Sequence, residues 1–199
     1  AYTSVFEKKE IVWIGDKNPG YSLYVHRLHQ LFPEAKIIHI TRDYRDNYLS
    51  LVRVNFEVPI VPLVVYRWKF ALKRMWKLKK QVPGLIHSVR YEDLVADPEH
   101  HFREVCHFLG ISYDPEVLSF YRKKSQVEDA YSGLDEIRQV HQSLFNPIST
   151  GRTQLWKTEM STREVRMADL VAGRAAGKAG YARQFTRFDP LLFLWIMPV

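Results

Sequence analysis

The chain has 199 residues, of which 46% are hydrophobic and 26% charged, and its formal net charge is +7. These values exclude a disordered or collagen-like chain, and the length suits one domain of ordinary size. The excess of positive charge favours an anionic ligand, without choosing among nucleic acid, phosphorylated cofactor, acidic glycan and membrane surface. The sequence contains no run of 18 apolar residues, so no membrane span is expected.

Short β-prone segments alternate with segments of helical spacing along the first half of the chain. Strands are predicted at 11–14, 36–40 and 85–91. Helices are predicted over 21–31, 45–54, 61–81 and 97–109, and beyond Gly110 over 115–124, 133–144 and 162–176. Asp97 caps the fourth of these helices, and Pro98 occupies its first position. The alternation predicts an α/β domain with a parallel sheet covered by helices.

Candidate ligand contacts follow the predicted strands, where parallel sheets bind their ligands. Arg42 closes the second strand at the entrance to a helix, so its guanidinium and the free N–H groups of the helix could receive a phosphate. The alternative is an arginine paired structurally with a nearby aspartate. Tyr91 ends the third strand and could present its ring to a base, although core packing is the commoner role of a single tyrosine.

A lysine also stands in a tight loop that follows the first predicted strand. Lys17 lies within Gly15–Pro19, and a lysine held in this way can neutralise charge on a transferring group. The alternative is an ordinary surface lysine in a turn. A reaction that removes a proton from an acceptor also needs a base, for which Asp16 and His141 are the nearest candidates within this sequence. The favoured alternatives are a loop cap for Asp16 and helical packing or a cofactor contact for His141.

The order of these segments resembles the sulfotransferases that use 3′-phosphoadenosine 5′-phosphosulfate (PAPS). The similarity is nearest to the bacterial branch related to protein-tyrosine sulfotransferases, and it extends over about residues 11–181. It rests on the segments Gly15–Pro19, Leu31–Asp46, Val89–Glu99 and Phe108–Gly110. The resemblance implies the P-loop nucleotide-kinase-like fold of that family, built on a helix-covered parallel sheet.

The resemblance also implies roles for individual residues. Arg42 and Ser50 match the pair that binds the 3′-phosphate, and Tyr91 matches the tyrosine that contacts the adenine. Lys17 matches the lysine that stabilises charge on the sulfuryl group, and Ser143 lies near the place of a serine that assists the same step. The late segment that closes over the 3′-phosphate comprises Ser149, Thr150, Gly151 and Arg152, with Arg152 as its anion contact and Lys157 as a substitute.

One departure from the family concerns the N-terminal side. The family opens with a strand, a phosphate loop and a helix that cradle the 5′-phosphosulfate, and it usually takes its general base from the next segment. Nothing before Ile11 resembles these parts. Residues 1–199 are therefore expected to form a single sulfotransferase domain that is N-terminally incomplete and, as written, catalytically incomplete.

Two other features invite different functions. His100, His101 and His39 suggest a metal, but adjacent histidines on a helix are expected to point to different faces, which favours a solvated pair. The segment 61–81 mixes aromatic residues with cations, as nucleic-acid surfaces do. Helical spacing sorts the aromatics onto a core stripe and the lysines onto another face, so nucleic-acid binding is not expected.

The sequence thus predicts a metal-independent sulfotransferase that uses PAPS and releases adenosine 3′,5′-bisphosphate after in-line transfer to a hydroxyl or amine. The alternatives are a non-catalytic module that binds adenosine bisphosphate and a nucleotide kinase-like phosphotransferase. The acceptor could be a glycan, a tyrosine peptide, a lipid or a small hydroxylated molecule, and the chain could form a homodimer. The resemblance implies the cytoplasm for a bacterial chain and the Golgi lumen for an animal one.

Overall fold

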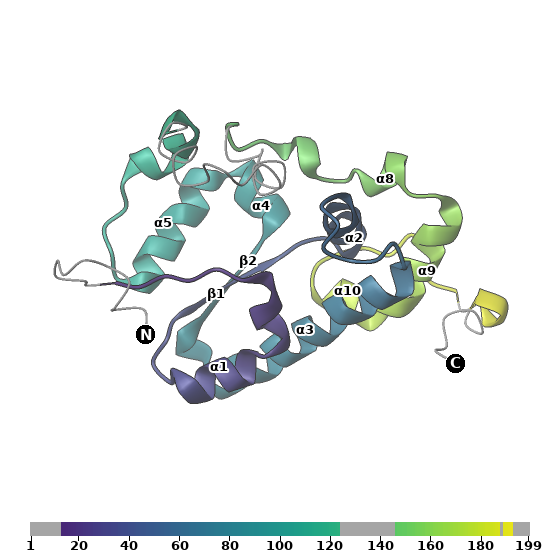
Figure 1. Cartoon of the computed structure of the whole chain (residues 1–199), viewed down its shortest axis with the longest axis horizontal. Coiled ribbons are helices and arrows are strands. Elements are labelled where there is room, and N and C mark those ends of the chain that lie inside the picture. The colour runs from purple at the N-terminus through teal and green to yellow at the C-terminus, as the bar shows by residue number, and fades with distance from the viewer. Residues whose placement is uncertain (1–12, 124–145, 188, 193–199) are drawn as a thin grey trace.

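The computed structural model describes residues 13–123, 146–187 and 189–192 (Figure 1). Its centre is a parallel sheet formed by β1 (Ile37–Thr41) and β2 (Ile86–Arg90), with Ile37 opposite Ile86 and Thr41 opposite Arg90. Parallel neighbours need a long crossover, and here α2 (Tyr44–Arg53) and α3 (Val61–Gln81) provide it. The helix-covered parallel sheet expected from the sequence is confirmed.

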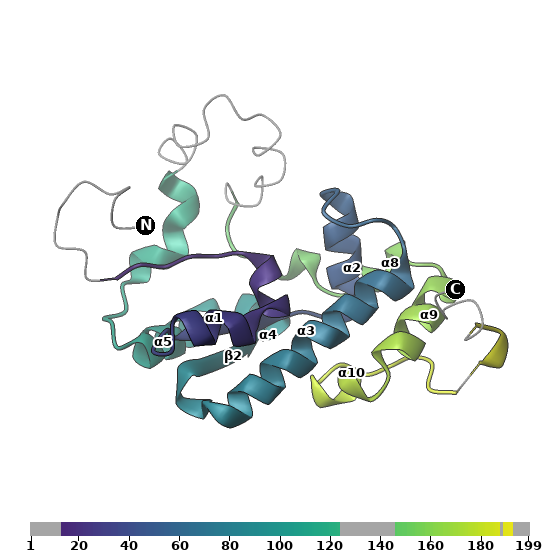
Figure 2. The ribbon, with the colours of Figure 1, turned by 60° about the horizontal axis from the view of Figure 1, so that its bottom comes forward.

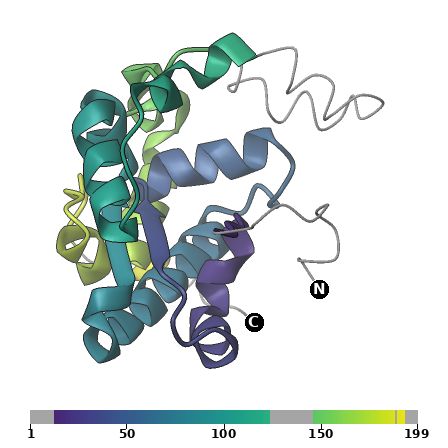
Figure 3. The same ribbon diagram turned by 90° about the vertical axis from the view of Figure 1, so that its left-hand side faces the viewer.

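Helices cover both sides of this sheet. α1 (Val25–Leu31) and α3 lie on one side, and α4 (Tyr91–Ala96) and α5 (Pro98–Leu109) lie on the other (Figures 1 and 3). The C-terminal part adds α8 (Trp156–Glu159), α9 (Thr162–Ala172) and α10 (Arg174–Lys178). Short 3₁₀ helices are η2 (Pro19–Leu23), η3 (Pro83–Leu85), η4 (Pro115–Lys123) and η6 (Thr150–Arg152).

The long helix α3 joins the two halves of the core. Its N-terminal half packs Val61, Val64 and Val65 against α2 and α9, and its C-terminal half packs Met75 and Leu78 against α1 and β2. Figure 2 shows α3 running from the side of α1 to the side of α9 and α10. Burial accounts for the aliphatic residues of this stripe and for Met75. Trp68 and Trp76 are half-buried, as the helical spacing predicted, but Tyr66 and Phe70 are exposed, so the prediction that the aromatics lie on a core stripe holds for only two of the four.

The sequence correctly predicts those helix boundaries that depend on neighbouring residues. α3 spans the predicted 61–81, and α5 begins at Pro98 with the Asp97 carboxylate accepting from the N–H of His100. α5 ends at Gly110, whose φ of 79° is in the left-handed region that favours glycine. Caps and apolar periodicity are properties of neighbouring residues, so the sequence alone displays them.

Five elements differ from the prediction. The predicted helix 21–31 is divided into the 3₁₀ helix η2 and α1, which begins at Val25. Trp13 and Ile14, the described part of the predicted first strand, are exposed and lie outside any strand. The segment 115–123 is a 3₁₀ helix rather than an α-helix, and the predicted helix 162–176 is broken at Gly173, where φ is 55°. α4 was not anticipated, because its six residues are too few to show helical periodicity. The predicted helix 133–144 lies outside the described residues.

Within the described ranges, no helix is both long and apolar enough to cross a membrane.

His39 of β1 gives the fold a testable dependence on pH. Burial, aided by the charge of Lys79, lowers the pKa of His39 from 6.5 to about 4. In the unfolded chain the His39 imidazole is protonated below about pH 6.5, whereas in the folded chain it stays neutral down to about pH 4. The free energy of unfolding therefore falls as the pH drops from 6.5 to 4. Between pH 7 and pH 4 the free energy of unfolding should fall in both proteins. We expect the fall to be about 2–3 kcal/mol smaller in His39→Gln than in the wild type.

Denaturant unfolding at several pH values measures this difference, and His107→Gln, which alters an exposed histidine of α5, is the matched control. Parallel losses in the wild type and in His39→Gln would show that His39 is not held neutral by the fold.

Candidate functional site

Arg42 stands at the carboxyl end of β1, where it meets two segments distant in the sequence. Its guanidinium carbon lies 4.7 Å from the centre of the Tyr91 ring, and its Nη2 donates to the carbonyl oxygen of Arg152 at 2.5 Å. Its Nε is buried and has no hydrogen-bond partner among the described residues. The structure therefore brings together Arg42, Tyr91 and the backbone of Arg152.

Glu92 ties the ends of the two strands to each other. Its carboxylate accepts from the N–H of Asp43 at 2.9 Å and from the Tyr181 hydroxyl at 2.9 Å. The same hydroxyl also contacts the carbonyl of Thr41 at 3.2 Å. Burial and the nearby Glu92 carboxylate raise the pKa of Tyr181, so the phenol keeps its proton. Hydrogen bonds of Glu92 and Tyr181 thus connect the ends of the two strands that Arg42 and Tyr91 follow.

The structural pairing considered for Arg42 belongs instead to Arg45, which is 2% exposed. Its Nη2 lies 2.7 Å from Asp43 Oδ2, and its Nη1 lies 3.5 Å from Asp169 Oδ1. Its guanidinium also stacks over the Trp156 ring at 3.5 Å. Arg45 therefore has two buried carboxylates beside its charge, although its Nη1 makes no hydrogen bond. Arg42, three residues earlier, contacts a ring and a carbonyl rather than a carboxylate.

The two aspartates at the start of α2 have different roles. Asp43 caps the helix by accepting from the N–H of Arg45. Asp46 is not a cap; it is 1% exposed and accepts from the N–H groups of Gln154 and Trp156. Burial raises the pKa of Asp46, and the two N–H groups and the charge of Arg42 oppose that rise.

The other predicted cofactor contacts lie in two places. Ser50 is half-buried in α2, the helix that Arg42 precedes. Ser149 immediately precedes η6, which comprises Thr150, Gly151 and Arg152, and all four residues are exposed. Lys157 is exposed as well and donates to the side chain of Gln154 at 2.6 Å.

The predicted catalytic residues are not brought to Arg42 by any described contact. Lys17 is exposed in the irregular segment that precedes η2, and no hydrogen bond joins it to Arg42, Tyr91 or η6. Asp16 accepts from the Tyr21 hydroxyl. Ser143 and His141 lie outside the described residues.

A cavity of about 400 Å³ borders this region. It shares Asp46, Gln154 and Lys157 with the segments just described, and Arg90 and Arg183 add positive charge to its wall. Arg42, Tyr91 and Ser149–Arg152 do not line it. Ser149–Arg152 are exposed, whereas Arg42 and Tyr91 are half-buried.

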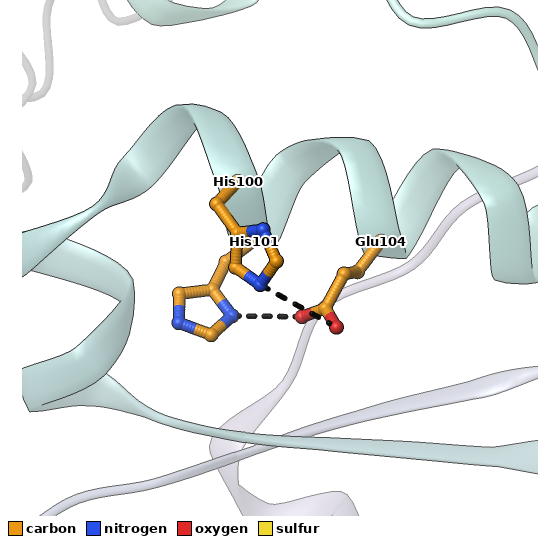
Figure 4. A group of neighbouring side chains, drawn as sticks. All are labelled: His100, His101 and Glu104. Atoms are coloured by element: carbon orange, nitrogen blue, oxygen red, sulfur yellow. Dashed lines mark hydrogen bonds and ion pairs between the residues drawn. The ribbon is translucent and has the colours of Figure 1, made fainter.

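The paired histidines of α5 differ from expectation. His100 and His101 both turn toward Glu104: His101 Nδ1 lies 2.9 Å and His100 Nε2 lies 3.6 Å from its carboxylate oxygens (Figure 4). The prediction that they point to different faces was wrong, because the long side chains of i, i+1 and i+4 can converge at their tips. The cluster has the ligand types of a metal site, but His100 and Glu104 are 60% and 44% exposed and pair well without a metal.

Comparisons with known proteins agree on one family. A family model described as sulfotransferase family matches residues 2–115. A putative protein-tyrosine sulfotransferase of Caenorhabditis briggsae is 23% identical over 164 residues, which cover 79% of this chain and 56% of that protein. An omega-hydroxy-beta-dihydromenaquinone-9 sulfotransferase of Mycobacterium bovis is 30% identical over 108 residues, or 48% of this chain and 28% of that one.

A solved structure has the same fold. The sulfotransferase domain from the curacin biosynthetic pathway superposes with a TM-score of 0.63 at 22% identity, over 84% of this chain and 62% of that domain. The chain thus spans between about a quarter and two thirds of the length of these similar proteins.

Proposed function

Since the chain belongs to the sulfotransferase family, we propose that it transfers a sulfuryl group from PAPS to a hydroxyl or amine acceptor by in-line displacement. The observation that carries this proposal is the Arg42 group, defined as Arg42, Tyr91 and η6. It combines a guanidinium, an aromatic ring and a turn of backbone at the carboxyl end of a parallel strand, which is where α/β sheets bind nucleotides.

The residues present fit the donor nucleotide. The buried Nε of Arg42 lacks a partner among the described side chains and backbone, and a phosphate oxygen is the acceptor that a guanidinium prefers. Arg42, Ser50 and Ser149–Arg152 would hold the 3′-phosphate. The Tyr91 ring, already stacked with Arg42 at 4.7 Å, would support the adenine.

When bound, PAPS supplies an activated sulfuryl group whose transfer builds negative charge on the bridging oxygen. Catalysis of such a reaction consists largely of positioning and electrostatic stabilisation. Lys17 would supply the positive charge and Ser143 a hydrogen bond, as the family resemblance implies. A base must accept the proton of the acceptor, and Asp16 and His141 are the candidates within this sequence.

In the intact enzyme, Lys17→Ala is expected to lower turnover by about 100-fold or more while changing the affinity for the nucleotide by less than about threefold. The reason is that a charge acting on the transition state contributes little to ground-state binding. Initial-rate kinetics give turnover, and titration with adenosine 3′,5′-bisphosphate gives affinity, with Lys73→Ala on the exposed face of α3 as the control. Equal losses in turnover and affinity would show that Lys17 only binds.

Sulfuryl transfer itself is tested on the intact enzyme, because residues 1–199 alone are expected to be catalytically incomplete. The assay follows radiolabelled sulfate from PAPS to acceptors. The panel contains a tyrosine peptide, a hydroxylated isoprenoid lipid, a glycan and a small phenol. Label in one acceptor class, lost in Arg42→Ala, is the expected result. Nucleotide binding without transfer to any acceptor would support a binding module instead, and magnesium-dependent transfer from ATP would support a kinase.

A further inference from the structure

We propose that Asp46 is a positioning residue for the 3′-phosphate site, because its buried carboxylate fixes the segment Arg152–Trp156 against the start of α2. The inference rests on the proposed function, since it concerns how the same site is assembled. Asp46 itself is not expected to touch the nucleotide.

The carboxylate of Asp46 is fully engaged with that segment. Oδ2 accepts from the N–H of Gln154 at 2.6 Å, and Oδ1 accepts from the N–H of Trp156 at 2.9 Å. The donors lie 108 and 110 residues away in the sequence, so these bonds join two parts of the chain that no local structure would bring together. With Asp46 only 1% exposed, water cannot easily replace either bond.

The segment held in this way is the one that contacts Arg42. The Arg152 carbonyl that accepts from Arg42 Nη2 lies two residues before Gln154. Gln154 has a φ of 60°, a left-handed conformation that is unfavourable for a residue other than glycine and therefore needs support from its surroundings. The two N–H bonds to Asp46 provide that support on either side of Leu155.

Arg42 and Asp46 thus hold one segment from two neighbouring positions, the end of β1 and the first turn of α2. If the Asp46 bonds are lost, the turn at Gln154 can relax, and the Arg152 carbonyl no longer fixes the Arg42 guanidinium. Arg152 itself would also leave its place at the site. We therefore expect a lower affinity for the 3′-phosphate, with a smaller effect on binding of the rest of the nucleotide.

The test compares Asp46→Ala, which removes both acceptors, with Asp46→Asn, which keeps one. Glu159→Gln is the matched control: the Arg53–Glu159 ion pair, at 2.7 Å, also joins α2 to α8, but it is exposed and does not involve Gln154. For each protein, equilibrium dialysis gives the ratio of the dissociation constants of 5′-AMP and adenosine 3′,5′-bisphosphate. Hydrogen exchange measures the protection of the 152–156 amides without any ligand.

We expect Asp46→Ala to reduce the dissociation-constant ratio about tenfold and to speed exchange in 152–156, Asp46→Asn to do so less, and Glu159→Gln to change neither. If Asp46→Ala does not fold, the Asn variant still decides the outcome. A wild-type ratio or unchanged exchange in a folded Asp46 variant would overturn the inference. A wild-type protein that does not distinguish the two nucleotides, while exchange responds as expected, would instead overturn the proposed function.

Discussion

Replacing Arg42 with alanine is expected to weaken binding of adenosine 3′,5′-bisphosphate by about 1.5–3 kcal/mol, which is roughly 10- to 150-fold. The structure gives the physical reason: Arg42 holds a buried Nε without a partner in the described chain, and its orientation is fixed by the Tyr91 ring and the Arg152 carbonyl. A guanidinium that is already oriented loses little conformational entropy when the phosphate binds. Calorimetric titration measures the change.

The control separates the 3′-phosphate from the remainder of the nucleotide. Binding of 5′-AMP should change much less in Arg42→Ala, and Arg103→Ala, which alters an exposed ion pair with Glu99 on α5, should affect neither nucleotide. Equal weakening of both nucleotides by Arg42→Ala would mean that Arg42 supports the fold or the adenine rather than the 3′-phosphate.

Replacing Arg45 with alanine is expected to lower the free energy of unfolding by about 3–5 kcal/mol, the cost of breaking a buried ion pair from one side. Arg45 is 2% exposed, and its removal leaves the carboxylates of Asp43 and Asp169 without their cation. Asp169 is fully buried and also accepts from the Tyr44 hydroxyl and from the N–H of Phe185. Urea unfolding at pH 7 measures the loss.

Arg53→Ala is the matched control for this variant, because Arg53 also forms an ion pair from α2 but is half exposed. An exposed pair of this kind contributes at most about 1 kcal/mol. If Arg45→Ala were no more destabilising than Arg53→Ala, Arg45 would not be the buried centre of charge that the structure indicates.

The sequence predicts the long helices and their ends because these depend on neighbouring residues. Apolar spacing defines α3, and the Asp97 cap and Gly110 set the ends of α5. The meeting of Arg42 with Tyr91 was also predictable, because both follow parallel strands whose carboxyl ends share one edge of the sheet.

Long-range contacts set the rest, and no local pattern shows them. Arg42 and Arg45 look alike in the sequence, and only the packing of Asp169 and Trp156 beside Arg45 separates a structural arginine from a candidate ligand contact. The role of Asp46 depends on the N–H groups of Gln154 and Trp156, which lie more than 100 residues away in the sequence. The convergence of His100 and His101 depends on side-chain rotamers, which helical position alone does not determine.

The most direct test of the central claim, that the Arg42 group binds the 3′-phosphate of an adenine nucleotide, is a calorimetric titration of this chain with adenosine 3′,5′-bisphosphate and with 5′-AMP. We expect the bisphosphate to bind at least about tenfold more tightly, since the two ligands differ only in the phosphate that Arg42 would contact. Equal affinities for the two nucleotides would contradict it.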